Sequence, residues 1–250
     1  MKNLLTKDSD KIIPLVLHKI TDDSNFKNWE DVSQENFNWI LKTILEKWIN
    51  QDNSNDFTGF LTFDDGNLSD YEFVFPSLLE KNISGIFFLL VNKIGTKGYL
   101  NWDQIREMKK NGMSFGSHGY SHQLMTTLDK DEVFKEFEIS KKILEDNIGE
   151  NIDSFSYPFG DCSKKLHEIG FSADYKFLYT SNHGIAKKNS TIIPRNNIHS
   201  RMSRSDISKI ITPNKSLIYK WKSEDLIKNF FKNTIGTEKY TKLRNLIFHD

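Results

Sequence analysis

Two short motifs place carboxylates and imidazoles where a metal ion could be bound. The TFDDG motif at residues 62–66 ends a strand-like run, and the HGYSH motif at residues 118–122 follows later in the chain. Of the two adjacent carboxylates, one can bind a metal ion while the other stays free to accept a proton. Asp65, His118 and His122 would form a ligand set that leaves coordination positions open, as catalytic sites do. The pattern predicts a metal-dependent hydrolase.

Each motif also has a purely structural interpretation. An Asp-Asp-Gly sequence is common in surface turns, and a single histidine is more often an ordinary packed or exposed residue. A third segment, FSYPFG at residues 155–160, is compatible with an ordinary strand-to-helix turn. Alternatively, the proline and glycine there fix the direction of a backbone N–H that could face an oxyanion.

The elements that must position these motifs alternate along the chain. Seven apolar runs are predicted as strands: 12–17, 59–63, 84–91, 113–116, 152–157, 175–179 and 191–193. Helices are predicted after Ser33 as N-cap and over 129–148 with Gly149 as C-cap. This alternation indicates βαβ units with a mostly parallel sheet in one domain spanning 1–250. Residues 223–250 are predicted as a C-terminal helical extension of two helices around Gly236.

Composition excludes several classes of protein. Lys plus Arg and Asp plus Glu both number 34, so no electrostatic argument for nucleic acid follows. Cys162 is the single cysteine, which excludes an intramolecular disulfide and a cysteine-rich zinc site. No apolar stretch reaches the roughly 20 residues of a transmembrane helix. Residues 1–11 lack the pattern of a secretory signal, so the expected location is cytoplasmic. The oligomeric state is left open.

The order and spacing of these motifs resemble a known family. TFDDG, SHGYSH and FSYPFG are similar to the motifs of the NodB-homology polysaccharide deacetylases of carbohydrate esterase family 4. PLVLH at 14–18 and IPR at 193–195 resemble segments of the branch that deacetylates poly-N-acetylglucosamine. The resemblance covers roughly residues 12–200. It implies an α/β fold, a distorted (β/α)7 barrel.

The resemblance also implies roles for individual residues. Asp64 would be the general base, and Asp65, His118 and His122 would hold a divalent metal, Zn²⁺ by default, with Ni²⁺, Co²⁺ or Fe²⁺ as alternatives. The Phe159 amide would help form the oxyanion hole.

His18 would be the general acid, with His199 and His183 as reserve candidates because Leu17 replaces the tyrosine that precedes the family's histidine. Two further departures occur in the motifs: Gly119 replaces a Ser or Thr, and Ser156 replaces an arginine that orients the catalytic aspartate. Arg195 is predicted to supply that guanidinium from a later strand.

The expected substrate is a carbohydrate carrying an acetamido group. Trp102 and Tyr120 are the aromatic residues favoured to stack on a sugar. Two alternatives stay open: deacylation of a small, lipid-linked or nucleotide-linked sugar, and a carbohydrate-binding protein whose catalytic site has decayed.

Overall fold

One curled, parallel sheet forms the centre of the computed structural model, which describes residues 10–22, 26, 28–49, 57–236 and 239–240. All pairings within this eight-stranded sheet are parallel. In spatial order the strands are β10 (Asn196–Asn197), β1 (Lys11–Leu17), β4 (Phe57–Phe63), β5 (Gly85–Leu89), β6 (Ser114–Ser117), β7 (Ser154–Ser156), β8 (Phe177–Tyr179) and β9 (Ile192–Ile193).

The predicted distorted barrel is confirmed, in the form of a half-barrel. Its edge strands β9 and β10 are not paired with each other in the described chain. All seven predicted strands are present within a few residues of their expected bounds, and β10 is an eighth that the sequence analysis missed. A two-residue strand has too short a pattern to be recognised from sequence. A separate two-stranded sheet, β2 (Ile20–Thr21) with β3 (Val32–Ser33), was also missed.

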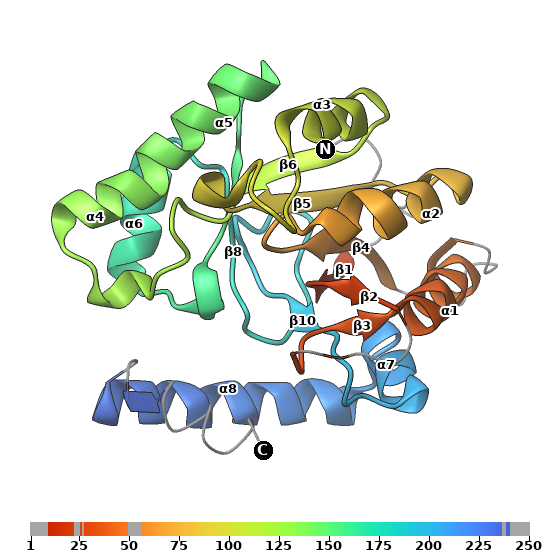
Figure 1. Ribbon diagram of the computed structural model, residues 1–250. Helices are drawn as coiled ribbons and strands as arrows, with labels where there is room; N and C mark the ends of the chain where they lie inside the picture. The colour runs from red at the N-terminus through yellow and green to blue at the C-terminus, as the bar shows by residue number, and fades with distance from the viewer. Residues whose placement is uncertain (1–9, 23–25, 27, 50–56, 237–238, 241–250) are drawn as a thin grey trace.

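Helices surround the sheet (Figure 1). They are α1 (Gln34–Ile44), α2 (Phe75–Glu80), α3 (Trp102–Lys110), α4 (Lys130–Phe134), α5 (Ser140–Ile148), α6 (Lys164–Ser172), α7 (Arg204–Ile211) and α8 (Lys215–Ile235). Three π-helical segments adjoin them: η1 (Leu45–Ile49), η2 (Asp70–Val74) and η5 (Lys135–Ile139). Short 3₁₀ turns are η3 (Val91–Lys93), η4 (Met125–Thr127) and η6 (Pro158–Gly160).

Local capping explains where the predicted helices begin and end. The Ser33 side chain accepts the Asn36 N–H at the start of α1, as predicted. Asp129 opens α4 through a reciprocal capping box with Glu132. Gly149 ends α5 in the left-handed conformation at φ 81°, also as predicted.

The sheet has apolar side chains on both faces. The larger cluster joins one face to the surrounding helices and includes the stacked rings of Phe63 and Phe87, whose centroids lie 4.8 Å apart. A smaller cluster occupies the other face: Ile12, Phe60, Phe88, Tyr179, Ala186 and Ile193. Because side chains alternate along a strand, Asp64 follows Phe60 and Thr62 on this second face. The fold therefore directs the candidate base away from the helical layer.

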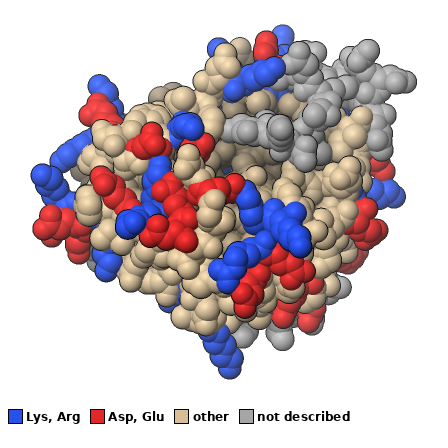
Figure 2. Space-filling view, turned by 90° about the horizontal axis from the view of Figure 1, so that it is seen from above, with Lys and Arg blue, Asp and Glu red and all other residues tan. Residues whose placement is uncertain are grey.

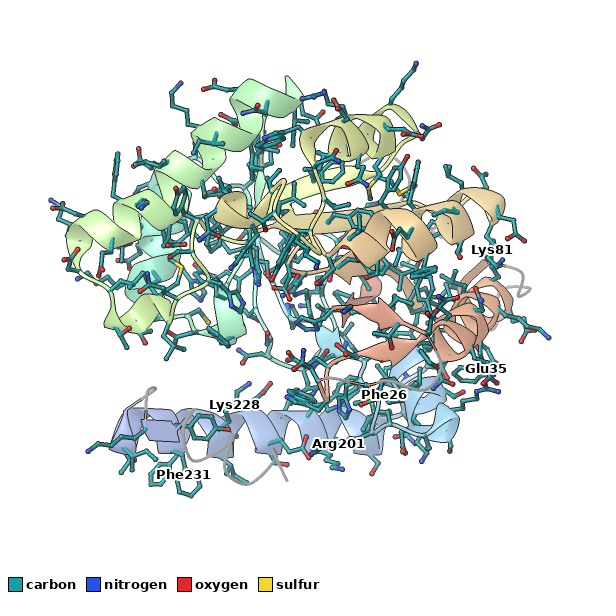
Figure 3. The ribbon with its side chains drawn as sticks, in the orientation of Figure 1. Phe26, Glu35, Lys81, Arg201, Lys228 and Phe231 are labelled. Carbon is teal, nitrogen blue, oxygen red and sulfur yellow. The ribbon has the colours of Figure 1, made fainter. Side chains whose placement is uncertain are left out.

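The C-terminal segment differs from the prediction. One helix, α8, begins at Lys215 rather than near 223 and ends before Gly236, which has φ 85°. The second predicted helix, over 237–250, falls mainly outside the described residues. In Figure 3, Lys228 lies on the side of α8 that faces the sheet and Phe231 on the opposite side.

Surface properties agree with the balanced composition. On the face shown in Figure 2, basic and acidic side chains are intermingled, without a dominant patch of one sign. Within the described segments, no helix combines the length and the apolar character needed to cross a bilayer.

Candidate metal centre

The predicted site residues follow the carboxyl ends of neighbouring parallel strands. His18 comes directly after β1, Asp64 and Asp65 after β4, and His118 after β6. Arg195 lies between β9 and β10. Since these strand ends meet at one edge of the sheet, residues far apart in sequence come together there.

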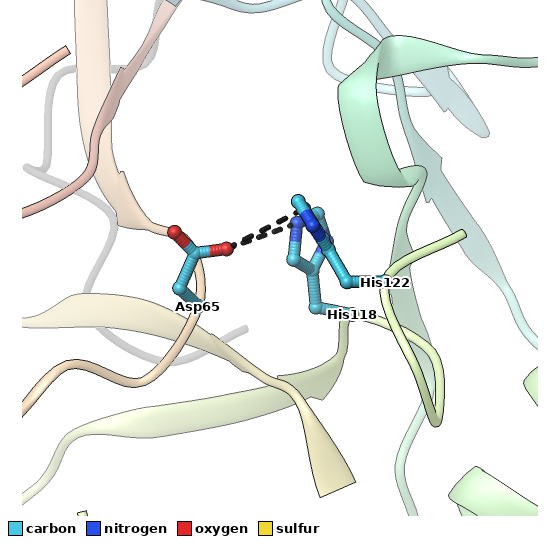
Figure 4. A group of neighbouring side chains, drawn as sticks. All are labelled: Asp65, His118 and His122. Carbon is cyan, nitrogen blue, oxygen red and sulfur yellow. Dashed lines mark ion pairs between the residues drawn. The ribbon is translucent and has the colours of Figure 1, made fainter. Parts of the chain in front are cut away.

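Asp65, His118 and His122 form a compact group of possible metal ligands (Figure 4). Asp65 Oδ1 lies 3.5 Å from His118 Nε2 and 3.7 Å from His122 Nε2. Two donors each about 2.1 Å from a shared tetrahedral ion would be about 3.4 Å apart, close to these separations. Asp65 Oδ1 is also buried without a hydrogen-bond partner in the described structure. The donor types, their spacing and this unsatisfied oxygen fit a divalent metal ion.

A hydrogen bond orients the imidazole of His118, and burial favours the neutral form of His122. His118 Nδ1 lies 2.8 Å from the Ser156 carbonyl oxygen, so Nδ1 donates to that carbonyl and Nε2 is the ring nitrogen directed toward Asp65. Burial and the neighbouring His118 lower the pKa of His122 to about 4. At neutral pH His122 therefore needs to lose no proton before binding a metal.

The candidate base, Asp64, is held by Arg195. Arg195 Nη1 donates to Asp64 Oδ1 and Nη2 donates to Oδ2, each at 2.7 Å, in a buried bidentate pair. The Ser156 hydroxyl donates to Asp64 Oδ2 at 3.0 Å and accepts from Arg195 Nη2 at 2.7 Å. Burial by itself would raise the pKa of Asp64. The positive charges of Arg195 and His118 lower this pKa by more than burial raises it, so the pKa lies well below its ordinary value. Asp64 is thus an ionised, fixed carboxylate.

The three candidate acids differ in their electrostatic surroundings. Burial lowers the pKa of His18, but the carboxylates of Glu30, Asp65 and Asp64 outweigh it and leave the pKa above the ordinary value. Burial lowers the pKa of both His183 and His199. His18 is therefore the one of these histidines that favours the protonated state.

A cavity of about 730 Å³ contains these groups. It is lined by His18, both aspartates of the TFDDG motif, the two histidines of the HGYSH motif, His183 and His199. The Phe159 ring also lines it, at 4.3 Å between centroids from His122.

The two aromatic residues favoured to stack on a sugar lie outside the cavity lining. Trp102 and Tyr120 do not line the cavity: Trp102 packs against the core at the start of α3, and the Tyr120 ring is covered by the Lys135 ammonium at 4.1 Å. Trp29, which the sequence analysis missed, does line it, with its ring 5.0 Å from that of His199. Trp29 lies in a loop without periodic pattern, so no local signal places it at the site.

Backbone strain is concentrated at the same edge. Five described non-glycine residues have positive φ, and three belong to the predicted site: Asp65 (78°), His122 (59°) and Phe159 (57°). This conformation is unfavourable for residues with a Cβ and tends to occur where side-chain direction matters.

Sequence comparison identifies the family to which this arrangement belongs. The profile described as polysaccharide deacetylase matches residues 51–178, about half of the chain. The Bacillus subtilis protein YxkH, which carries the name of the same family, is 27% identical over 128 residues, covering 51% of this chain and 46% of that protein. The chain spans less than half the length of the curated relatives it matches.

Solved structures share the fold. The Streptococcus pyogenes deacetylase PplD, solved in complex with acetate, superposes with a TM-score of 0.72 at 24% identity, covering 81% of this chain and 99% of that one. The polysaccharide deacetylase BC0361 of Bacillus cereus gives a TM-score of 0.68 at 25% identity, covering 80% and 69%. The resemblance stated from the motifs is confirmed: the chain belongs to the polysaccharide deacetylase family.

Proposed function

We propose that the protein is a metal-dependent N-deacetylase that hydrolyses an acetamido group of an N-acetylhexosamine in a glycan or glycan precursor. The observation that carries the proposal is the meeting, in one cavity, of the Asp65–His118–His122 ligand set and the Arg195-paired carboxylate of Asp64. Zn²⁺ is the proposed ion, and Ni²⁺, Co²⁺ or Fe²⁺ suit the same donors. When bound, such an ion supplies Lewis-acid chemistry, polarising a carbonyl oxygen and making water more acidic.

Each remaining group has a separate role in this proposal. Asp64 accepts the proton of the attacking water, and Arg195 keeps that carboxylate ionised and oriented. His18 hands a proton to the departing amine. The Phe159 N–H contributes to oxyanion stabilisation, a kind of donor worth about 3–4 kcal/mol in other hydrolases. Acid–base catalysis of this type contributes about 10²–10⁴-fold in rate.

A first experiment combines metal analysis with turnover. Protein purified without chelators or affinity-column metal should contain about one divalent ion per chain, the stoichiometry of a mononuclear site. It should release acetate from N-acetylglucosamine oligomers. Absence of metal even after reconstitution, together with absence of turnover, would argue against the proposal. Glycan binding without turnover in the metal-loaded protein would indicate a carbohydrate-binding protein instead.

The second candidate is deacylation of a short or linked sugar rather than a long polymer. One observation favours it: Lys228 of α8, together with Tyr240 just beyond that helix, forms part of the cavity wall. A helix across the site limits the room available to neighbouring residues of a polymer. Comparing N-acetylglucosamine oligomers of increasing length with nucleotide-linked and lipid-linked N-acetyl sugars distinguishes the two. Higher kcat/KM on the short or linked sugars would support the second candidate.

A further inference from the structure

The carboxylate of Glu136 binds the loop that joins His118 to His122. Glu136 belongs to η5 and is only 2% exposed. The Tyr120 N–H donates to Oε2 at 2.5 Å, and the Ser121 N–H donates to Oε1 at 3.2 Å and to Oε2 at 3.1 Å. The Ser121 hydroxyl donates to Oε1 as well. Three donors in the middle of the loop therefore converge on one side chain.

Other groups hold three further polar atoms of this loop. The Gly119 N–H donates to the Ser117 hydroxyl at 3.0 Å. The Gly119 carbonyl accepts from the Val91 N–H at 3.2 Å, and the Tyr120 carbonyl accepts from the Asn92 N–H at 3.1 Å. Among the described residues, the neighbouring strand ends provide no backbone acceptor for the N–H groups of Tyr120 and Ser121, and the Glu136 carboxylate supplies these acceptors instead.

The identity of residue 119 is coupled to Glu136. Gly119 has φ 83°, and a Cβ built there would lie 2.4 Å from Glu136 Oε2. The Ser or Thr that is common at this position would collide with the carboxylate. A side chain at residue 119 would require this carboxylate to shift, and the positive φ would strain the backbone.

A buried carboxylate in this position is costly unless its hydrogen bonds compensate for lost hydration. Glu136 occupies the buried stripe of the α4–α5 helical segment, between Val133 and Ser140. Within the described chain it forms no salt bridge with a basic side chain, so the loop donors are its main compensation. Glutamine could not replace it, because its NH₂ group would face an N–H or O–H donor.

We propose that Glu136 is a positioning residue of the metal centre, holding the loop so that His118 and His122 face Asp65 before an ion binds. The inference rests on the metal site of the proposed function. Groups that orient metal ligands commonly affect metal affinity by about 10–100-fold. A carboxylate that orders the ligand loop in advance removes part of the ordering cost from the binding step.

The test measures Zn²⁺ affinity by competition with a chromogenic chelator in four proteins: wild type, Glu136→Gln, Glu138→Gln and Asp65→Ala. Glu138 is an exposed neighbour in the same helical segment, so its variant matches the chemical change without touching the loop. We expect a rise in Kd of about 10–100-fold for Glu136→Gln and no change for Glu138→Gln. A wild-type Kd in a folded Glu136→Gln protein would overturn the inference, even if its thermal midpoint had fallen.

Amide hydrogen exchange in metal-free protein provides a second, independent readout. Glu136 is the acceptor of both the Tyr120 and Ser121 amides, so their exchange should be slow in metal-free wild type and faster in Glu136→Gln. Rapid exchange of both amides in wild type would overturn the inference, and this measurement decides it if Glu136→Gln does not fold. If wild type binds no Zn²⁺ while these amides are protected, the proposed function fails and the loop-ordering role of Glu136 stands.

Discussion

The guanidinium of Arg195 and the carboxylate of Asp64 form a buried, parallel pair of 2.7 Å hydrogen bonds across 131 positions of sequence. Arg195 is further held by the Thr180 carbonyl at 3.2 Å and the Thr62 hydroxyl at 3.1 Å, and it lies over the Phe88 ring. The guanidinium is therefore fixed by these hydrogen bonds and by its contact with Phe88 of the smaller apolar cluster. Its planar fork is the feature that an ammonium group cannot reproduce.

Arg195→Lys should lower kcat on the order of 10–100-fold while leaving metal content unchanged, because the carboxylate of Asp64 loses its bidentate anchor. Steady-state kinetics with metal analysis measures both quantities. Arg204→Lys is the control, since Arg204 makes an exposed contact with Glu35 at 2.6 Å. Unchanged kcat in Arg195→Lys would exclude the orienting role.

Arg195→Met should move the acid limb of the kcat/KM profile to higher pH. Arg195 lowers the pKa of Asp64 while burial raises it. Without the guanidinium the effect of burial remains, so the pKa rises and Asp64 takes up its proton at a higher pH. Breaking such a buried pair also costs about 3–5 kcal/mol of stability, so the profile should be recorded well below the variant's Tm. An acid limb at the wild-type position would show that another group titrates there.

Asp64→Asn and Asp65→Ala should separate catalysis from metal binding. Asp64→Asn removes the proton acceptor and should reduce turnover by about 10²–10⁴-fold with metal retained. Asp65→Ala removes one of the three candidate ligands and should abolish both metal binding and turnover. Metal analysis and acetate release are measured on the same preparations. Equal metal loss in the two variants would contradict the division of roles.

His18 should control the alkaline limb of the activity profile. Its pKa lies above the ordinary value because nearby carboxylates outweigh burial, whereas the pKa values of His183 and His199 are lowered. A protonated acid is lost as pH rises through its pKa, so His18→Ala should abolish this limb while the other two alanine variants retain it. If His199→Ala or His183→Ala abolished the limb instead, that histidine would be the acid.

Asp70→Asn should stabilise the metal-free protein increasingly as pH rises. Burial, reinforced by Asp65, raises the pKa of Asp70 well above its ordinary value. Above about pH 4 the unfolded chain releases this proton while the folded protein keeps it, so the unfolded state gains stability with pH. Asparagine removes that linkage. Thermal unfolding of both proteins at pH 4, 6 and 8 measures this effect. A difference in Tm between Asp70→Asn and wild type that did not change with pH would contradict the prediction.

Local sequence determined the main elements and the candidate metal ligands. Strand periodicity, the Ser33 N-cap and the Gly149 C-cap depend on neighbouring residues only, and the structure has them where predicted. Asp65, His118 and His122 could be nominated because ligand types and strand ends are visible in short windows of sequence.

The pairing of Arg195 with Asp64 was predicted from the motifs, but tertiary structure decided its bidentate geometry and the contacts of the other groups. The packing of the helical layer brought Glu136 to the histidine loop, and folding placed Trp29 rather than Trp102 in the cavity. The extent of α8 and its place in the cavity wall were likewise decided by packing. The physical reason is the range of the interactions: caps and periodicity act over a few residues, whereas a buried ion pair or a cavity wall depends on how distant elements pack together.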